Sequence, residues 1–175
     1  MIKKQVSIGT IKIQYSLLLF LLLLGFTQCK SPAAKEDRLS DDALMDTVQR
    51  RTFNYFWEGA EPNSGLARER IHMDGVYPEN DQNVITSGGS GFGIMAILAG
   101  IDRGYVTRQE GLERMEKIVS FLETADRFHG TYPHWWYGDT GKVKPFGQKD
   151  NGGDLVETAF IMQALLSVHQ YYIDG

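Results

Sequence analysis

The chain has 175 residues, of which 18 are basic and 22 acidic, and its formal net charge is −4. This acidic balance argues against nucleic acids and anionic membrane surfaces as partners, because both attract basic proteins. The composition holds one cysteine, so the chain cannot form an intramolecular disulfide.

The first 28 residues have the composition of an export signal rather than of a folded segment. Lys3, Lys4 and Lys12 accompany the apolar run of residues 17–24. That run is much shorter than the roughly 20 residues that span a bilayer, and it fits the core of a secretory signal. Cys29 follows five residues later. We therefore interpret residues 1–28 as a lipoprotein signal peptide and Cys29 as the lipidation site, with an ordinary signal peptide and a chance cysteine as the alternative.

Cleavage before Cys29 removes three lysines and no acid. The mature chain then has 147 residues, 15 of them basic and 22 acidic, and a net charge of −7. Residues 29–39 are polar and without pattern, which predicts a tether, and residues 40–175 follow as the folded domain. We expect an exported monomer in the bacterial envelope, at the outer membrane or in the periplasm, that touches the membrane only through its lipid.

Four helices and no convincing strand are expected in this domain. Ser40 is a good N-cap for the first helix, which Gly59 and Pro62 end, and the second helix is expected over residues 88–102. Thr107 and Glu110 predict a capping box at the start of the third. The expected buried face of the first helix is Leu44, Val48, Thr52, Tyr55 and Phe56. That of the third helix is Leu112, Met115, Ile118, Val119 and Leu122.

The fourth helix is expected to start at Asp154, with Glu157 as its box partner. Its expected buried face is Val156, Phe160, Ile161, Ala164, Leu165 and Val168.

Long and short connections alternate along the chain, which is typical of helical hairpins stacked in a ring or solenoid with the long loops at one rim. A closed ring of six hairpins needs on the order of 300 residues. Four helices therefore predict the N-terminal part of a larger all-α domain, with apolar faces unpaired at one edge.

The glycine-rich run TSGGSGFG, residues 86–93, fits neither of two familiar motifs. A nucleophile elbow around Ser90 would need a glycine at position 92, where the chain has Phe92. A dinucleotide-binding fingerprint would need its third glycine at position 94, where the chain has Ile94. We interpret the run as a helix start whose small residues allow close approach of a helix or a ligand.

Residues 129–160 combine aromatic rings with carboxylates, the combination that proteins use to hold and cleave sugar chains. Trp135, Trp136 and Tyr137 are candidate sugar-binding rings, and adjacent side chains of an extended segment point opposite ways, so one tryptophan is expected in the core. His134 is a candidate for a hydrogen bond to a sugar hydroxyl, with a locally satisfied loop histidine as the alternative. The four histidines lack metal-ligand spacing, so we expect neither a metal nor another cofactor.

Three acids follow the aromatic rings. Asp154 and Glu157 are explained by helix capping alone, whereas Asp150 lies in the loop KDNGGD, where two glycines are expected to allow a tight turn. Acids this close repel one another, which should raise at least one pKa, as a general acid requires. All three are candidate catalytic residues.

Four segments, RRTFNYFWEGAEPNSGLARER, VITSGGSGFGIMAILAGIDRGYVTRQEG, HGTYPHWWYGDTGK and DNGGDLVETAFIMQALL, resemble the glycoamylase-like family of bacterial lipoproteins, which includes inverting endo-β-1,2-glucanases. The resemblance spans residues 44–172. It implies an (α/α)₆ toroid with a substrate cleft at the loop-bearing rim. It also implies that Asp150, Asp154 and Glu157 line that cleft, that the tryptophans and His134 lie near the sugar, and that further cleft acids lie in a longer chain.

Together with the aromatic and acidic residues, this resemblance implies a glycoside hydrolase of the cell envelope that acts on β-glucan, most specifically β-1,2-glucan or its oligosaccharides, by inverting acid–base hydrolysis. A lipoprotein that captures glycans without cleaving them is the alternative from another class. An inactive truncated fragment is the third.

Overall fold

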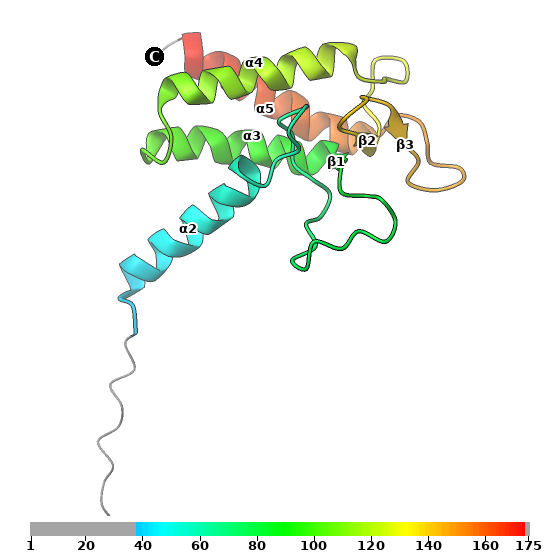
Figure 1. Ribbon diagram of the computed structural model, residues 1–175. Coiled ribbons are helices and arrows are strands. Elements are labelled where there is room, and N and C mark those ends of the chain that lie inside the picture. The colour runs from blue at the N-terminus through cyan, green and yellow to red at the C-terminus, as the bar shows by residue number, and fades with distance from the viewer. Residues whose placement is uncertain (1–37, 174–175) are drawn as a thin grey trace, which may run out of the picture. The chain divides into compact units, whose positions relative to one another are not determined.

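The computed structural model describes residues 38–173, so the expectations for the signal peptide, for Cys29 and for most of the tether lie outside the described residues. The folded unit begins at Ser40. Its described part contains four helices and three short strands (Figure 1), which are α2 (Asp41–Trp57), β1 (Val84–Thr86), α3 (Ser87–Asp102), α4 (Arg108–Thr124), β2 (Trp135–Tyr137), β3 (Val143–Lys144) and α5 (Leu155–Ile173).

The strands correct the expectation that the domain contains none. They form an antiparallel sheet in the order β1-β2-β3, in which Thr86 is the partner of Trp135 and Ile85 that of Trp136. Alternation of apolar and polar residues is readable only over four or more positions, and these strands have two or three. The pairing joins the loop before α3 to the aromatic loop.

The helix starts confirm most of the expected caps. The Ser40 hydroxyl accepts a hydrogen bond from the Ala43 amide, and Thr107 and Glu110 form a complete capping box. At α5, Asp154 accepts from the amides of Val156 and Glu157, as a capping carboxylate should. The Glu157 side chain does not complete a box there, because the Asp154 amide donates instead to the Tyr132 carbonyl, 2.7 Å away.

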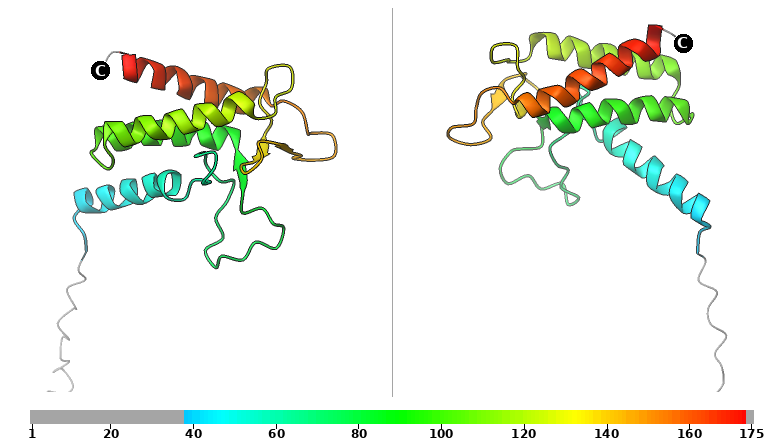
Figure 2. Two further views of the ribbon diagram at one scale, coloured as in Figure 1. Left: turned by 45° about the horizontal axis from the view of Figure 1, so that its top comes forward. Right: turned by 180° about the vertical axis from the view of Figure 1, so that it is seen from behind.

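The small residues of α3 allow its neighbours to come close, as expected from the sequence. A Cβ added at Gly91 would lie 2.6 Å from the Phe160 backbone of α5, and one at Gly100 would lie 2.3 Å from the Phe53 ring of α2. Real Cβ atoms do not approach so closely, so these positions require glycine. Helix α3 therefore lies against both α2 and α5 (Figures 1 and 2).

The core is shared by α3, α4, α5 and the sheet, but the expected faces are only partly buried. Phe53 is the one buried residue of α2, and Leu44 and Val48 are each 51% exposed. On α5, Ile161 and Ala164 are buried as expected, whereas Val156 is 65% exposed. Apolar side chains are thus left exposed on α2, α3 and α5, as an open arc of helices predicts. The exposed ones include Leu44, Met45, Val48, Phe92, Met95, Leu155, Val156, Phe160, Met162 and Leu166.

The long connections gather at one end of the helices, and the short link between α3 and α4 lies at the other (Figure 1). This arrangement confirms the expected common rim of long loops. Within residues 38–173, no helix has the length and apolar character needed to cross a membrane.

Candidate active site

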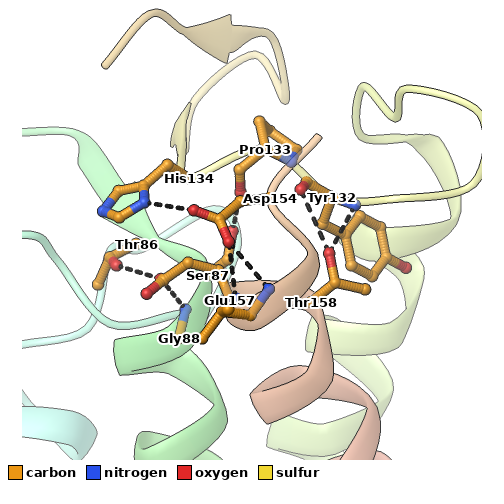
Figure 3. Close-up of polar contacts among 10 residues, drawn as sticks. Thr86, Ser87, Gly88, Tyr132, Pro133, His134, Asp154, Glu157 and Thr158 are labelled. Atoms are coloured by element: carbon orange, nitrogen blue, oxygen red, sulfur yellow. Dashed lines mark hydrogen bonds and ion pairs between the residues drawn. The ribbon is translucent and has the colours of Figure 1, made fainter. Parts of the chain in front are cut away.

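The candidate site lies where three elements begin: α3, β2 and α5 (Figure 3). The segment of residues 132–134 runs between the starts of the two helices. On one side, the Ser87 amide donates to the His134 carbonyl at 3.1 Å, and the Ser87 hydroxyl donates to the Pro133 carbonyl. On the other, the Thr158 hydroxyl accepts from the Tyr132 amide at 2.9 Å. Both helices therefore fix the backbone that carries His134.

The centre of the site is a histidine–carboxylate pair. His134 Nδ1 lies 2.9 Å from Asp154 Oδ2, while Oδ1 of the same carboxylate accepts from the Val156 and Glu157 amides at 3.0 Å each. The two side chains are 26% and 23% exposed. Because Nδ1 is bound to Asp154, Nε2 is the ring atom of His134 that can face a ligand.

The surroundings of Asp154 favour its ionised form. Partial burial alone would raise its pKa, but hydrogen bonds from the Glu157 amide, from His134 and from the Val156 amide outweigh burial, and the pKa lies below its usual value. The expected rise in the pKa of an acid therefore does not occur at Asp154. A carboxylate that stays ionised is suited to accepting a proton, not to donating one.

Glu157 is directed away from Asp154 and toward α3. Its Oε2 accepts from the Gly88 amide and, at 3.3 Å, from the Thr86 hydroxyl. It thus satisfies an amide at the start of α3, where the helix dipole favours negative charge. A Cβ at Gly88 would lie 2.6 Å from this oxygen, so the glycine makes room for the carboxylate.

Asp150 lies in an exposed turn, but not in the one expected from Gly152 and Gly153. Asp150 and Gly147 each donate an amide hydrogen to the other's carbonyl, at 3.1 and 3.2 Å, and this pair closes a turn with residues 148–149 at its tip. Gly153 serves a different purpose, since a Cβ there would lie 2.6 Å from Thr131 Cβ.

The two tryptophans point in opposite directions, as expected for neighbours in an extended segment. Trp136 is completely buried, and its indole N–H donates to the Asp126 carbonyl at 3.0 Å. This burial leaves Trp136 no exposed face for a sugar. Trp135 is only partly buried, and Tyr137, on the same side of the strand, is 38% exposed.

Phe146 is an additional member of the site that the motifs did not single out. Its ring is 50% exposed, and its centroid lies 4.3 Å from that of His134 and 4.8 Å from that of Trp135. Lys144 Nζ lies 5.0 Å from the centre of the Trp135 ring. A lone apolar residue in a polar loop was the only signal in the sequence.

A cavity of about 150 Å³ lies beside the site, between the loop that follows α4 and the loop that precedes α5. It is too small for the 300–1,000 Å³ that is typical of ligand pockets. Among the described residues, no group of three His, Cys, Asp or Glu side chains is arranged to hold a metal ion. The cavity is lined by Asp126, Arg127, Phe128, Pro133, Val143, Asn151 and Gly152.

The chain is similar in sequence to a curated glucan hydrolase. A curated relative from Parabacteroides distasonis, an exo-β-1,2-glucooligosaccharide sophorohydrolase acting at the non-reducing end, is 56% identical over 135 residues, which are 77% of this chain. No family model matches the chain.

Two solved structures are also similar to this chain in sequence and fold. An endo-β-1,2-glucanase from Chitinophaga pinensis, in complex with sophorotriose and glucose, is 69% identical over 79% of this chain with a TM-score of 0.77. A glucoamylase-like protein from Bacteroides caccae is 88% identical over 78% of this chain with a TM-score of 0.75. The chain spans 18% of the length of the curated relative and 33% of each of these two solved chains.

Proposed function

The chain belongs to the glucoamylase-like family together with the β-1,2-glucanases of Bacteroidetes, and we propose that it forms part of a hydrolase of β-1,2-glucan or its oligosaccharides. The observation that carries this proposal is the pair of His134 and Asp154 beside the partly exposed ring of Trp135 and the exposed ring of Phe146. A fixed carboxylate next to aromatic faces suits both proton transfer and sugar stacking.

Asp154 is assigned the role of the base that activates water. Its hydrogen bonds keep it ionised, and the bond to His134 orients its second oxygen. The leaving oxygen needs a separate acid, and inversion requires carboxyl groups about 6.5–9.5 Å apart. Residues three apart on a helix have Cβ atoms only about 5–6 Å apart, and Glu157 already binds the Gly88 amide. Within this chain Asp150 is assigned the role of the acid, with a carboxyl outside this chain as the alternative. Glu157, on α5, supports the site by binding the Gly88 amide at the start of α3.

Sugar contacts are assigned to the side chains that remain accessible. Trp135 and Tyr137 offer ring surface on one side of β2, and His134 offers Nε2 to a hydroxyl. Rings of this kind stack on the apolar faces of pyranose units. Trp136 is assigned to the core.

The finer architecture is also part of the proposal. Completion of an (α/α)₆ toroid would cover the unpaired apolar faces of α2, α3 and α5, and would set the long loops around one cleft. We further propose residues 1–28 as a signal peptide, lipid attachment at Cys29, residues 29–39 as a tether and a monomer in the cell envelope. Incorporation of labelled fatty acid into the wild-type protein, but not into Cys29→Ser, tests the anchor.

The test of the activity uses the protein at its natural full length. Purified protein is incubated with β-1,2-glucan and, as controls, with β-1,3- and β-1,4-glucans, and the products are followed by NMR. We expect cleavage of the β-1,2-glucan alone, with products that first appear as α-anomers because the reaction inverts. Binding without turnover would favour a glycan-capturing protein instead, and cleavage of only the other linkages would refute the assigned substrate.

A further inference from the structure

Phe146 combines exposure with specific packing. It is the apolar residue at the base of an exposed polar turn and is 50% exposed, yet its ring lies against His134 and Trp135. A half-exposed phenylalanine leaves much of its apolar ring surface in water, so burial alone is a weak reason for this residue at this position.

Backbone bonds tie Phe146 to Asp150. The Phe146 amide donates to the Asp150 carbonyl at 2.9 Å, and the same carbonyl accepts from Gly147 at 3.2 Å. The Phe146 ring in turn lies 4.3 Å from that of His134, which binds Asp154. Three successive contacts therefore join Asp150 to Asp154 through Phe146 and His134.

The turn has little else in its own structure to hold it in place. Residues 145–151 are all exposed, and an isolated two-stranded hairpin is marginally stable in water. Aromatic pairs at this separation attract one another beyond the area that they bury. The ring is therefore placed to restrain the whole turn.

We infer that Phe146 is a positioning residue that holds the Asp150 turn against His134, and thereby sets where the Asp150 carboxyl stands relative to Asp154. This inference rests on the proposed catalytic role of Asp150. A competing use of the same ring is stacking of its exposed face on a sugar unit, and the two uses predict different results.

The experiment compares Phe146→Ala and Phe146→Tyr with wild type in the full-length protein. Met73→Ala is the control, because Met73 is 95% exposed and lies in the loop before β1, away from the Asp150 turn in the chain. Amide hydrogen exchange of Gly147 and Asp150 reports on the turn without any need for activity. We expect exchange about tenfold faster in Phe146→Ala, and unchanged in Phe146→Tyr and Met73→Ala.

Turnover supplies the second measurement. In Phe146→Ala, kcat should fall with little change in KM. In an Asp150→Asn background the same substitution should cause no further loss, because both changes remove the same positioned carboxyl. Phe146→Tyr should retain kcat.

Unchanged exchange in Phe146→Ala would overturn the inference, and so would a full additional loss of kcat in the Asp150→Asn background. A rise in KM for long glucans with kcat and exchange unchanged would assign the ring to sugar stacking instead. If the wild-type protein does not cleave β-1,2-glucan, the proposed function fails, while the exchange comparison still decides whether Phe146 anchors the turn.

Discussion

His134 and Asp154 are 20 residues apart in the chain, yet His134 Nδ1 and Asp154 Oδ2 lie 2.9 Å apart. The other oxygen of the same carboxylate caps α5 through the amides of Val156 and Glu157. One side chain therefore both stabilises a helix start and orients an imidazole. Changes at this position should affect stability and chemistry together, and suitable substitutions can separate the two.

Replacing Asp154 separates capping from charge. Asparagine is as good an N-cap as aspartate, whereas alanine is a poor one, so Asp154→Ala should cost about 1 kcal/mol more of the free energy of unfolding than Asp154→Asn. Urea denaturation of the two variants and wild type measures the difference. Equal losses in both variants would show that the cap contributes little and that the charge accounts for the effect.

The pH dependence of stability should reveal the ionised state of Asp154. Its pKa in the folded protein lies below the usual 3.8, because the hydrogen bonds from Glu157, His134 and Val156 outweigh burial. The ionised carboxylate therefore stabilises the fold above the unfolded-state pKa, and this contribution is lost as the pH falls through the folded-state pKa. Wild type should exceed Asp154→Asn in stability above about pH 5 and lose that margin on acidification. A margin that grows towards low pH would contradict the lowered pKa.

Glu157 and Gly88 should be energetically coupled. In the wild-type background, Gly88→Ala pushes the Glu157 carboxylate from its bond to the amide of residue 88 and should cost about 1–2 kcal/mol of stability. In a Glu157→Ala background the same change should be neutral or stabilising, because alanine favours helix over glycine by about 1 kcal/mol. A double-mutant cycle by urea denaturation measures the coupling, and strict additivity would refute the contact.

The two neighbouring tryptophans should behave in opposite ways. Trp136→Ala removes a completely buried ring and should cost about 3–5 kcal/mol of stability. Trp135→Ala should cost much less stability and instead raise KM for glucan in the full-length protein, because its ring is partly exposed beside the site. The reverse pattern, with Trp135 essential for folding and Trp136 for binding, would contradict the assigned faces.

Local signals made part of this structure predictable. The caps of Ser40, Thr107 and Asp154 each depend on partners within three residues, and all three occur as expected. Glu157 lay outside this reach, because its partner Gly88 is 69 residues away in the chain. Its spacing from Asp154 fitted a capping box, but the Tyr132 carbonyl had already taken the amide that the box would have used.

The site was predictable in its composition rather than in its geometry. Alternation along an extended segment correctly separated Trp135 from Trp136, but it could not say which of the two is buried. Burial is decided by Phe121 and Tyr132, whose rings meet Trp136 in the core. Phe146 carried no motif, and only the fold brings its ring to His134.

We propose that Asp150 and Asp154 both act in glucan hydrolysis, and the turnover of the full-length Asp150→Asn and Asp154→Asn variants on β-1,2-glucan tests this proposal most directly. Each variant should lose at least about 100-fold in kcat, the range expected when a general acid or base is removed, while circular dichroism shows an intact fold. Wild-type turnover in both variants would contradict the assignment of this site.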